Sequence, residues 1–309
     1  MRFAIIGVGG VGGYFGGRLA EAGHEVYLLA RGAHLAAIRA EGLRVLSPLG
    51  DFTARPAGAT DSPAKVGPVD VVLVGVKAWQ LPEAAPSLAP LIGPATAVVP
   101  LLNGVEAAEI VAGAVGREHT MGGLCRISAA LEAPGVIRHV GMEPSVVFGE
   151  LDNSRTPRAE ALLAALAGAG VRASIAADIA VATWEKFMLI CAWSGLGAVT
   201  RAPIGVWRAL PETRALAEQV VAEVAAVARA RGVAVPPGAE AATLAFIDGV
   251  PPGGLASLQR DLVEGRPSEL EAQSGAVVRL GRDAGVPTPA SAFIYAALLP
   301  QERAARGEG

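Results

Sequence analysis

The sequence MRFAIIGVGGVGGYFGGRLAEAGHEVYLLAR, residues 1–31, decides the fold. Residues 3–6 are a short apolar run, typical of a buried parallel strand, and G-V-G-G-V-G at 7–12 fits the pattern G-x-G-x-x-G. The first glycine allows a tight turn, the second leaves room for a pyrophosphate beside the backbone, and the third lets the next helix pack closely on the sheet. A helix over 11–22 and a second strand over 25–30 complete the unit. This context predicts a Rossmann-type dinucleotide-binding domain.

The end of the second strand indicates which dinucleotide is bound. An acidic residue there binds the ribose 2′-hydroxyl of NAD, whereas a nearby arginine accommodates the 2′-phosphate of NADP. This chain has Ala30-Arg31-Gly32 and no acid at the tip, and a planar guanidinium suits bidentate phosphate binding. We therefore expect NADPH, with Arg31 on its phosphate; the alternative is a solvent-exposed loop arginine. The expected contacts of the glycine loop are Gly7, Val8, Gly9, Gly10, Val11 and Gly12.

The composition argues against several other classes of protein. The chain has 309 residues and a net charge of −3, which predicts no basic surface for nucleic acid. Its two cysteines, Cys125 and Cys191, lie far apart, and the histidines lack metal-ligand spacing, so we expect no metal site and a cytoplasmic protein. Mean hydropathy is +0.43. The most apolar windows, 69–76 and 187–199, are too short or glycine-broken to cross about 30 Å of hydrocarbon, and the start does not resemble a signal peptide.

The order of predicted elements divides the chain near residue 177. Before it, strands alternate with helices, which implies parallel strand–helix–strand units; strand-like segments within 122–150 are expected to continue the same sheet, partly antiparallel. After residue 178 helical periodicity dominates, over 180–193, 212–231, 239–248 and 268–284. We expect an NADP(H)-binding, doubly wound Rossmann-type domain over 1–177 and an all-α substrate domain over 178–309.

Candidate residues for chemistry fall in both parts. Arg31, Lys77 and Asn103 each follow a predicted strand, where ligands bind in open α/β sheets. Lys186 is an amine on an otherwise apolar helix; it could protonate an alkoxide as hydride arrives at a carbonyl carbon, or it could be a lysine that extends to the surface. Ser268 and Glu271 fit a helix capping box, which leaves the adjacent Glu269 available for a ligand or for Lys186.

Together these segments resemble the ketopantoate reductase family. The matching segments are G-V-G-G-V-G-G-Y-F-G-G-R-L-A at 7–20, Ala30-Arg31-Gly32, V-K-A-W-Q at 76–80, L-N-G at 102–104, Trp184-x-Lys186, Ser257-x-x-x-Asp261-Leu262, S-E-L-E at 268–271 and G-V-P-T-P at 285–289. They run in the family's order from the first strand to about residue 300. The resemblance implies a Rossmann domain that binds NADPH and an all-α domain that closes over an α-keto acid. It also implies reduction of 2-dehydropantoate to pantoate, in pantothenate and coenzyme A biosynthesis.

The resemblance also implies roles for individual residues. Lys186 matches the general acid, and Glu269 matches its partner carboxylate, near substrate and cofactor. Ser257 matches a serine that holds the substrate carboxylate. The remaining assignments are Lys77 and Asn103 lining the cofactor and the substrate, Ser194 facing the substrate, and Arg31 on the 2′-phosphate.

Four positions depart from the family pattern, which usually has asparagine there: Ile190, Ser194, Gly254 and Ser274. A site built to hydrogen-bond a substrate hydroxyl discriminates strongly, and replacing an amide removes that contact. The substrate is therefore ketopantoate or a different, more apolar 2-oxo or 2-hydroxy acid; a third alternative is an NADP-binding regulator without catalysis. The alanine-rich helices over 216–229 and 272–280 could pack within the domain or across a homodimer.

Overall fold

The computed structural model describes residues 1–308, which fall into two compact units. The first comprises Met1–Leu102 and Glu106–Ile179. The second comprises Asn103–Val105 and the chain from Ala180 onward. The expected fold class, a Rossmann-type sheet followed by an all-α domain, is confirmed. The division lies two residues beyond the expected position, and the short segment Asn103–Val105 groups with the helices.

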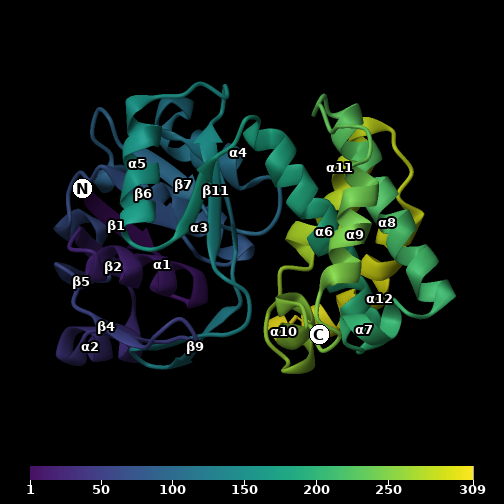
Figure 1. Cartoon of the computed structure of the whole chain (residues 1–309), viewed down its shortest axis with the longest axis horizontal. Helices are drawn as coiled ribbons and strands as arrows, with labels where there is room; N and C mark the ends of the chain where they lie inside the picture. The colour runs from purple at the N-terminus through teal and green to yellow at the C-terminus, as the bar shows by residue number, and fades with distance from the viewer. Residues whose placement is uncertain (309) are drawn as a thin grey trace. The chain divides into compact units, whose positions relative to one another are not determined.

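The first unit contains the strands and the helices that cover them (Figure 1). In chain order these are β1 (Arg2–Ile6), α1 (Gly10–Glu21), β2 (Glu25–Leu29), α2 (Gly32–Glu41), β3 (Leu43–Leu46), β4 (Phe52–Ala54), β5 (Gly58–Thr60), η1 (Pro63–Lys65), β6 (Val71–Val74), η2 (Ala78–Gln80), α3 (Leu81–Ala84), η3 (Ala85–Leu91), β7 (Ala97–Pro100), α4 (Ala107–Val115), η4 (Arg117–His119), β8 (Met121–Arg126), β9 (Ala129–Ala133), β10 (Val136–His139), β11 (Ser145–Glu150), α5 (Pro157–Gly168) and β12 (Arg172–Ile175).

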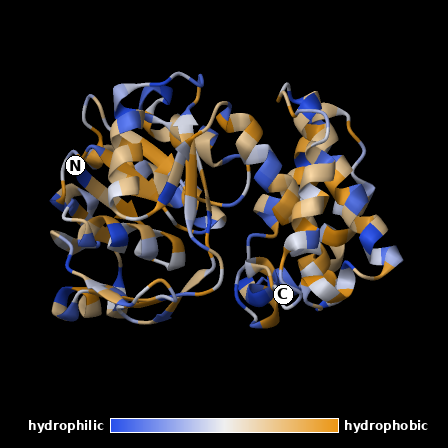
Figure 2. Cartoon of the chain, viewed as in Figure 1, coloured by the Kyte–Doolittle hydropathy of each residue, from blue (hydrophilic) through white to orange (hydrophobic). Residues whose placement is uncertain are grey.

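Five parallel strands form the main sheet, in the order β5-β2-β1-β6-β7. Their residues are mostly apolar and buried, as expected for strands covered on both faces (Figure 2). The carboxyl ends align, because Ile6 pairs with Leu29 and Val74, and Val74 pairs with Pro100. The chain runs from β1 outward to β2 and then returns to β6 on the other side of β1. This reversal is the switch point at which such sheets bind ligands.

The segment 122–150 does not continue one sheet, so that expectation is wrong in part. β11 pairs with β8 on one side and with β12 on the other, in a three-stranded sheet that adjoins β7 through a bridge from Val98 to Thr120. β9 and β10 instead join β3 and β4 in a four-stranded sheet. Helix α1 contacts both this sheet and the main one. Strand periodicity predicts which face is buried but not which strand is the partner.

The chain between β6 and β7 forms short helical pieces where a strand–helix–strand unit would have one continuous helix. η2, α3 and η3 follow one another, and only α3 is α-helical. Pro82, Pro86 and Pro90 lie in this stretch. A proline inside a helix removes a backbone donor and clashes with the preceding turn, so a continuous α-helix cannot form here.

The second unit is helical and has its own hydrophobic core. Its elements are α6 (Ile179–Thr200), α7 (Ile204–Trp207), α8 (Pro211–Ala230), α9 (Ala239–Gly249), α10 (Ser257–Val263), the π-helical turn η5 (Glu271–Gly275), α11 (Ala276–Ala284) and α12 (Pro289–Arg306). Within residues 1–308, α6 alone is long and apolar enough to span a membrane by length and composition. Its best 18-residue window is 61% buried in the structure, as in the central helix of a globular domain.

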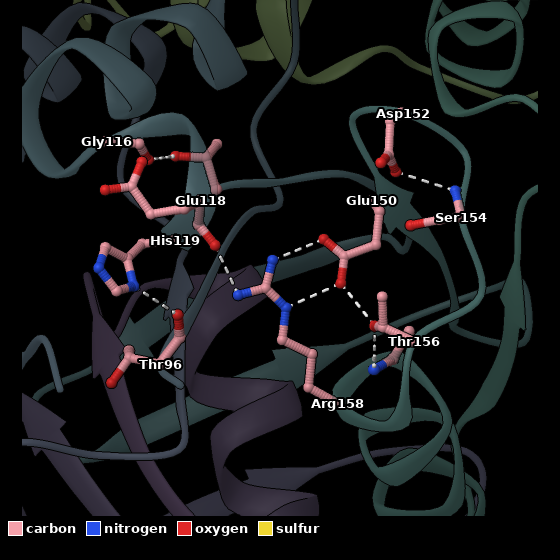
Figure 3. A network of polar contacts seen from close by, with 11 residues as sticks. Thr96, Gly116, Glu118, His119, Glu150, Asp152, Ser154, Thr156 and Arg158 are labelled. Atoms are coloured by element: carbon pink, nitrogen blue, oxygen red, sulfur yellow. Dashed lines mark hydrogen bonds and ion pairs between the residues drawn. The ribbon is translucent and has the colours of Figure 1, made fainter. Parts of the chain in front are cut away.

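An ion pair between a buried carboxylate and a half-buried arginine joins the end of β11 to α5 (Figure 3). Arg158 donates to both carboxylate oxygens of Glu150, at 2.7 and 2.6 Å, and to the carbonyl oxygen of Glu118 at 2.7 Å. Thr156 adds a hydrogen bond to Glu150 at 2.6 Å. Burial acts to raise the pKa of Glu150, but the hydrogen bonds from Arg158 and Thr156 outweigh it, so the pKa lies below its ordinary value.

Replacing Arg158 by Met should destabilise the protein in a pH-dependent way. The Glu150 side chain is 7% exposed and that of Arg158 is 25% exposed, so leaving the carboxylate without its partner should cost about 1–3 kcal/mol. Because the folded pKa of Glu150 is lowered, the pair's contribution is present above the unfolded pKa of about 4.3 and is lost as the pH falls through the folded value. Denaturant unfolding from pH 7 to pH 3 measures this. Arg155→Met is the control, since its pair with Glu160 is exposed and should contribute under about 1 kcal/mol. An equal loss of unfolding free energy in Arg158→Met and Arg155→Met would contradict a stabilising role for the Glu150–Arg158 pair.

Candidate active site

The glycine loop has the geometry of a phosphate-binding turn. Gly7 has φ +84°, and a Cβ there would stand 2.7 Å from the backbone nitrogen of Val76. A Cβ on Gly12 would stand 2.1 Å from the carbonyl oxygen of Gly7. At Gly9, by contrast, nothing lies within 4 Å of the Cβ position. Gly7 and Gly12 are therefore required by packing, whereas Gly9 leaves open space at the start of α1, where a pyrophosphate would fit.

Lys77 lies beside this loop. A Cβ on Gly75 would stand 2.9 Å from the backbone nitrogen of Gly12, so the end of β6 passes directly against the start of α1. Lys77 follows two residues later, and its backbone N–H donates to the side chain of Gln80 at 3.0 Å. The structure therefore brings the predicted loop residues and Lys77 together at the switch point.

Arg31 stands at the end of β2, where it precedes α2 and is exposed. One turn on, His34 joins two other segments, which the sequence did not indicate. The N–H of Gly135 donates to its Nδ1 at 2.8 Å, so Nε2 carries the proton and donates to the carbonyl oxygen of Val8 at 2.8 Å. Burial lowers the pKa of His34, which favours this neutral form. His34 thus ties the glycine loop to the helix that follows Arg31.

In the helical unit, two predicted site residues meet directly. The side-chain amide of Asn103 donates to Glu269 at 2.8 Å. Glu269 is 5% exposed. A Cβ on Gly104 would stand 3.0 Å from the carbonyl oxygen of Ala272, so the segment after β7 packs closely on η5. The Asn103 bond orients the Glu269 carboxylate.

Ser268 is held by a different residue from the one predicted. The Glu302 carboxylate accepts hydrogen bonds from the backbone N–H and the hydroxyl of Ser268, and from Arg306. Glu271 instead accepts from the hydroxyl of Tyr295 at 2.7 Å. The expected capping box is therefore wrong, since the α-helix does not begin there and α12 supplies the acid. Glu302 clamps the chain immediately before Glu269.

Lys186 lies in α6 and is 8% exposed, which does not fit a lysine that extends to the surface. Residues four, seven and eleven positions further along share its face of the helix. The last of these, Gly197, packs on α10, because a Cβ there would stand 2.6 Å from Oε1 of Gln259. Ser257 is the first residue of α10. The face that carries Lys186 therefore packs on the helix that Ser257 begins.

The departures from the family pattern lie around this face and around η5. Ser194 is 4% exposed and Ser274 is 3% exposed. The Ser274 hydroxyl approaches α6 at Gly195, at 3.8 Å from the Cβ position. Gln273 is 1% exposed, and neither atom of its amide has a hydrogen-bond partner among residues 1–308. The sequence analysis did not single out Gln273. The one feature that could have indicated it is that this amide precedes Ser274, the position at which the family usually has asparagine.

Two surface hollows of the first unit, of about 540 and 580 Å³, contain none of the predicted residues. One surrounds the Glu150–Arg158 pair, and the other lies beside Ser47 and His139. Several of their charged groups already have protein partners, as Glu150 has Arg158 and Arg138 has Glu132. We therefore do not assign the chemistry to either hollow.

A Rossmann-type unit with an open glycine loop, joined to a helical unit with a buried lysine, defines an oxidoreductase that uses a dinucleotide. The chain belongs to the ketopantoate reductase family: residues 3–153 match the model described as ketopantoate reductase PanE/ApbA, and residues 178–302 match that of its C-terminal part.

Relatives match over nearly the whole chain. A 2-dehydropantoate 2-reductase of Mesorhizobium japonicum is 33% identical, over 94% of each chain. The crystal structure of a PanE/ApbA family ketopantoate reductase from Ralstonia eutropha is similar with a TM-score of 0.90 and 32% identity, covering 99% of this chain and 100% of that one. A D-mandelate dehydrogenase, solved with NADH and anilino(oxo)acetate, has a TM-score of 0.89 and 25% identity, covering 99% of each chain.

Two alanine substitutions should separate packing from binding in the glycine loop. Gly12→Ala places a methyl group against a backbone carbonyl, so we expect the melting temperature to fall by roughly 5 °C or more. Gly9→Ala has open space and should leave the melting temperature nearly unchanged while weakening nicotinamide nucleotide binding. Calorimetry of both variants, with titration of the nucleotide, tests this. Unaltered nucleotide affinity in Gly9→Ala would contradict the assigned position of the pyrophosphate.

Proposed function

We propose that this protein uses NADPH to reduce a 2-oxo acid, with 2-dehydropantoate (ketopantoate) as substrate and pantoate as product, in the cytoplasm. Family membership and relatives named 2-dehydropantoate 2-reductase support the proposal. The observation that carries it is the buried amine of Lys186, in the same unit as the Asn103–Glu269 pair. Reduction of a ketone requires a proton at the oxygen, and a buried amine is a suitable donor.

The residues of the first unit fit the cofactor. The space at Gly9 suits a pyrophosphate, and the surrounding loop offers the N–H groups at the start of α1. Arg31 would bind the 2′-phosphate, and Lys77 would lie beside the cofactor's phosphates or nicotinamide. When bound, the nucleotide supplies the hydride that reduces the carbonyl carbon.

The residues of the helical unit would act on the substrate. Lys186 donates its proton to the substrate oxygen. Ser257 donates a hydrogen bond to the substrate carboxylate. The Glu269 carboxylate is oriented by a hydrogen bond from Asn103 at 2.8 Å. It accepts hydrogen bonds from the Lys186 amine or from the substrate, and so positions the amine and the substrate oxygen for the proton transfer.

A second candidate is the same reaction on a different 2-oxo acid. Ile190 and Ser274 replace amides that a hydroxylated substrate would need, and the similar D-mandelate dehydrogenase acts on an aromatic 2-hydroxy acid by its name. Consumption of NADPH with ketopantoate and with other 2-oxo acids separates the possibilities. Turnover of ketopantoate supports the first, turnover only of others the second, and no turnover a regulator without catalysis.

Lys186→Ala should lower kcat by about 10²- to 10⁴-fold, the usual contribution of a positioned acid. Nucleotide binding should be largely retained, because the residues proposed to hold the phosphates, the glycine loop and Arg31, are unchanged. Steady-state kinetics and nucleotide titration measure both quantities. Lys65→Ala, which removes an exposed lysine of the first unit, is the control. Normal turnover in Lys186→Ala would overturn the assignment of the acid.

Arg31→Ala should weaken NADPH binding by about tenfold or more and leave NADH binding unchanged. A hydrogen-bonded ion pair to the 2′-phosphate is lost only with NADPH. Titration of both nucleotides measures the ratio, with NADH as the internal control. Tighter binding of NADH than of NADPH by the unmodified protein would instead favour an NAD-dependent enzyme.

A further inference from the structure

Trp193 lies on the face of α6 that carries the proposed acid. Ile190 lies four residues after Lys186 and Trp193 lies seven residues after it, so these three residues share one face of the helix. Trp193 and Ile190 are half-buried and pack against the helical core. The surface next to the amine is therefore apolar and holds no carboxamide at these two positions.

The indole of Trp193 covers the segment that leads into α10. A Cβ on Gly254 would stand 3.1 Å from Cζ2 of Trp193 and 3.0 Å from Cγ1 of Val250. A side chain at Gly254 would therefore be in tight contact with the ring, which would have to shift by a few tenths of an ångström to admit it. Ser257 follows three residues later. The ring thus links the face that carries Lys186 with the segment that carries Ser257.

The indole N–H of Trp193 is buried and has no hydrogen-bond partner among residues 1–308. A buried donor without a partner is unfavourable, and phenylalanine would avoid this cost. The ring is therefore better explained by its apolar area than by its polar atom.

We infer that Trp193, together with Ile190, forms the surface that selects the substrate's side chain, and that the substrate is a 2-oxo acid with an apolar, branched alkyl or aryl group on the carbonyl carbon. The inference rests on the proposed 2-oxo acid reduction. It favours the second candidate of that proposal, because acids of the same size as ketopantoate that lack its hydroxyl group match this apolar surface.

A matched pair of substrates tests the inference. Ketopantoate and 3,3-dimethyl-2-oxobutanoate differ only in one hydroxyl group. A site built to bind that hydroxyl rejects the analogue without it by about 10⁴-fold. We expect kcat/KM for 3,3-dimethyl-2-oxobutanoate to equal or exceed that for ketopantoate, and phenylglyoxylate to be reduced as well. Each substrate is assayed with NADPH and with NADH.

Three variants assign the preference to the residues. Trp193→Ala should lower kcat/KM for 3,3-dimethyl-2-oxobutanoate about tenfold more than for ketopantoate, while Trp193→Phe should keep the preference and at least the original melting temperature. Ile190→Asn should shift the ratio toward ketopantoate by about tenfold. Trp207→Phe is the control, since Trp207 is a core residue of the same unit, 1% exposed, and should leave the ratio unchanged.

The outcomes distinguish this inference from the proposed function. A preference for ketopantoate of 10²-fold or more would overturn the inference and support the proposed substrate. If Trp193→Ala lowered kcat/KM equally for both substrates, Trp193 would not be a specificity-determining residue. No turnover of any of the three acids with either nucleotide would overturn the proposed function, and the inference with it.

Discussion

The close approach of α1 to its neighbours is the constraint on which the first unit depends. Glycines on several faces of this helix touch backbone or core side chains: a Cβ on Gly10 would stand 2.2 Å from the carbonyl oxygen of Ala129, and one on Gly16 would stand 2.7 Å from the side chain of Ile5. Each glycine costs a helix up to about 1 kcal/mol, so α1 is stabilised by packing between two sheets rather than by its own propensity. The same contacts bring its first turn against the end of β6.

Features that depend on neighbouring residues could be predicted from the sequence. The glycine loop, the strand before it and Arg31 after β2 are encoded within about thirty residues. Parallel strands then place Lys77 at the same edge without any knowledge of side-chain contacts. The prediction of the all-α domain likewise needed only helical periodicity.

Features that depend on distant residues could not be predicted. Strand β10 alternates as an edge of the main sheet would, but pairs with β3, about ninety residues earlier. Glu271 has the spacing of a capping box, yet Glu302, 34 residues after Ser268, accepts the hydrogen bonds. The sequence alone shows glycine at 254, whereas the structure shows that Val250 and the ring of Trp193 leave little room for a side chain there. In each case the local sequence pattern is compatible with several structures, and contacts with distant residues determine which one forms.

The hydrogen bond from Asn103 to Glu269 has a consequence for the making of this protein. It joins residues 166 positions apart, although both belong to the helical unit. During translation Asn103 is therefore synthesised well before Glu269, and this hydrogen bond forms only after most of the chain has been made. A fragment that begins at Ala180 would retain every helix of the unit but lack this donor. The helical unit is thus compact in space but is encoded by two separate segments of the chain.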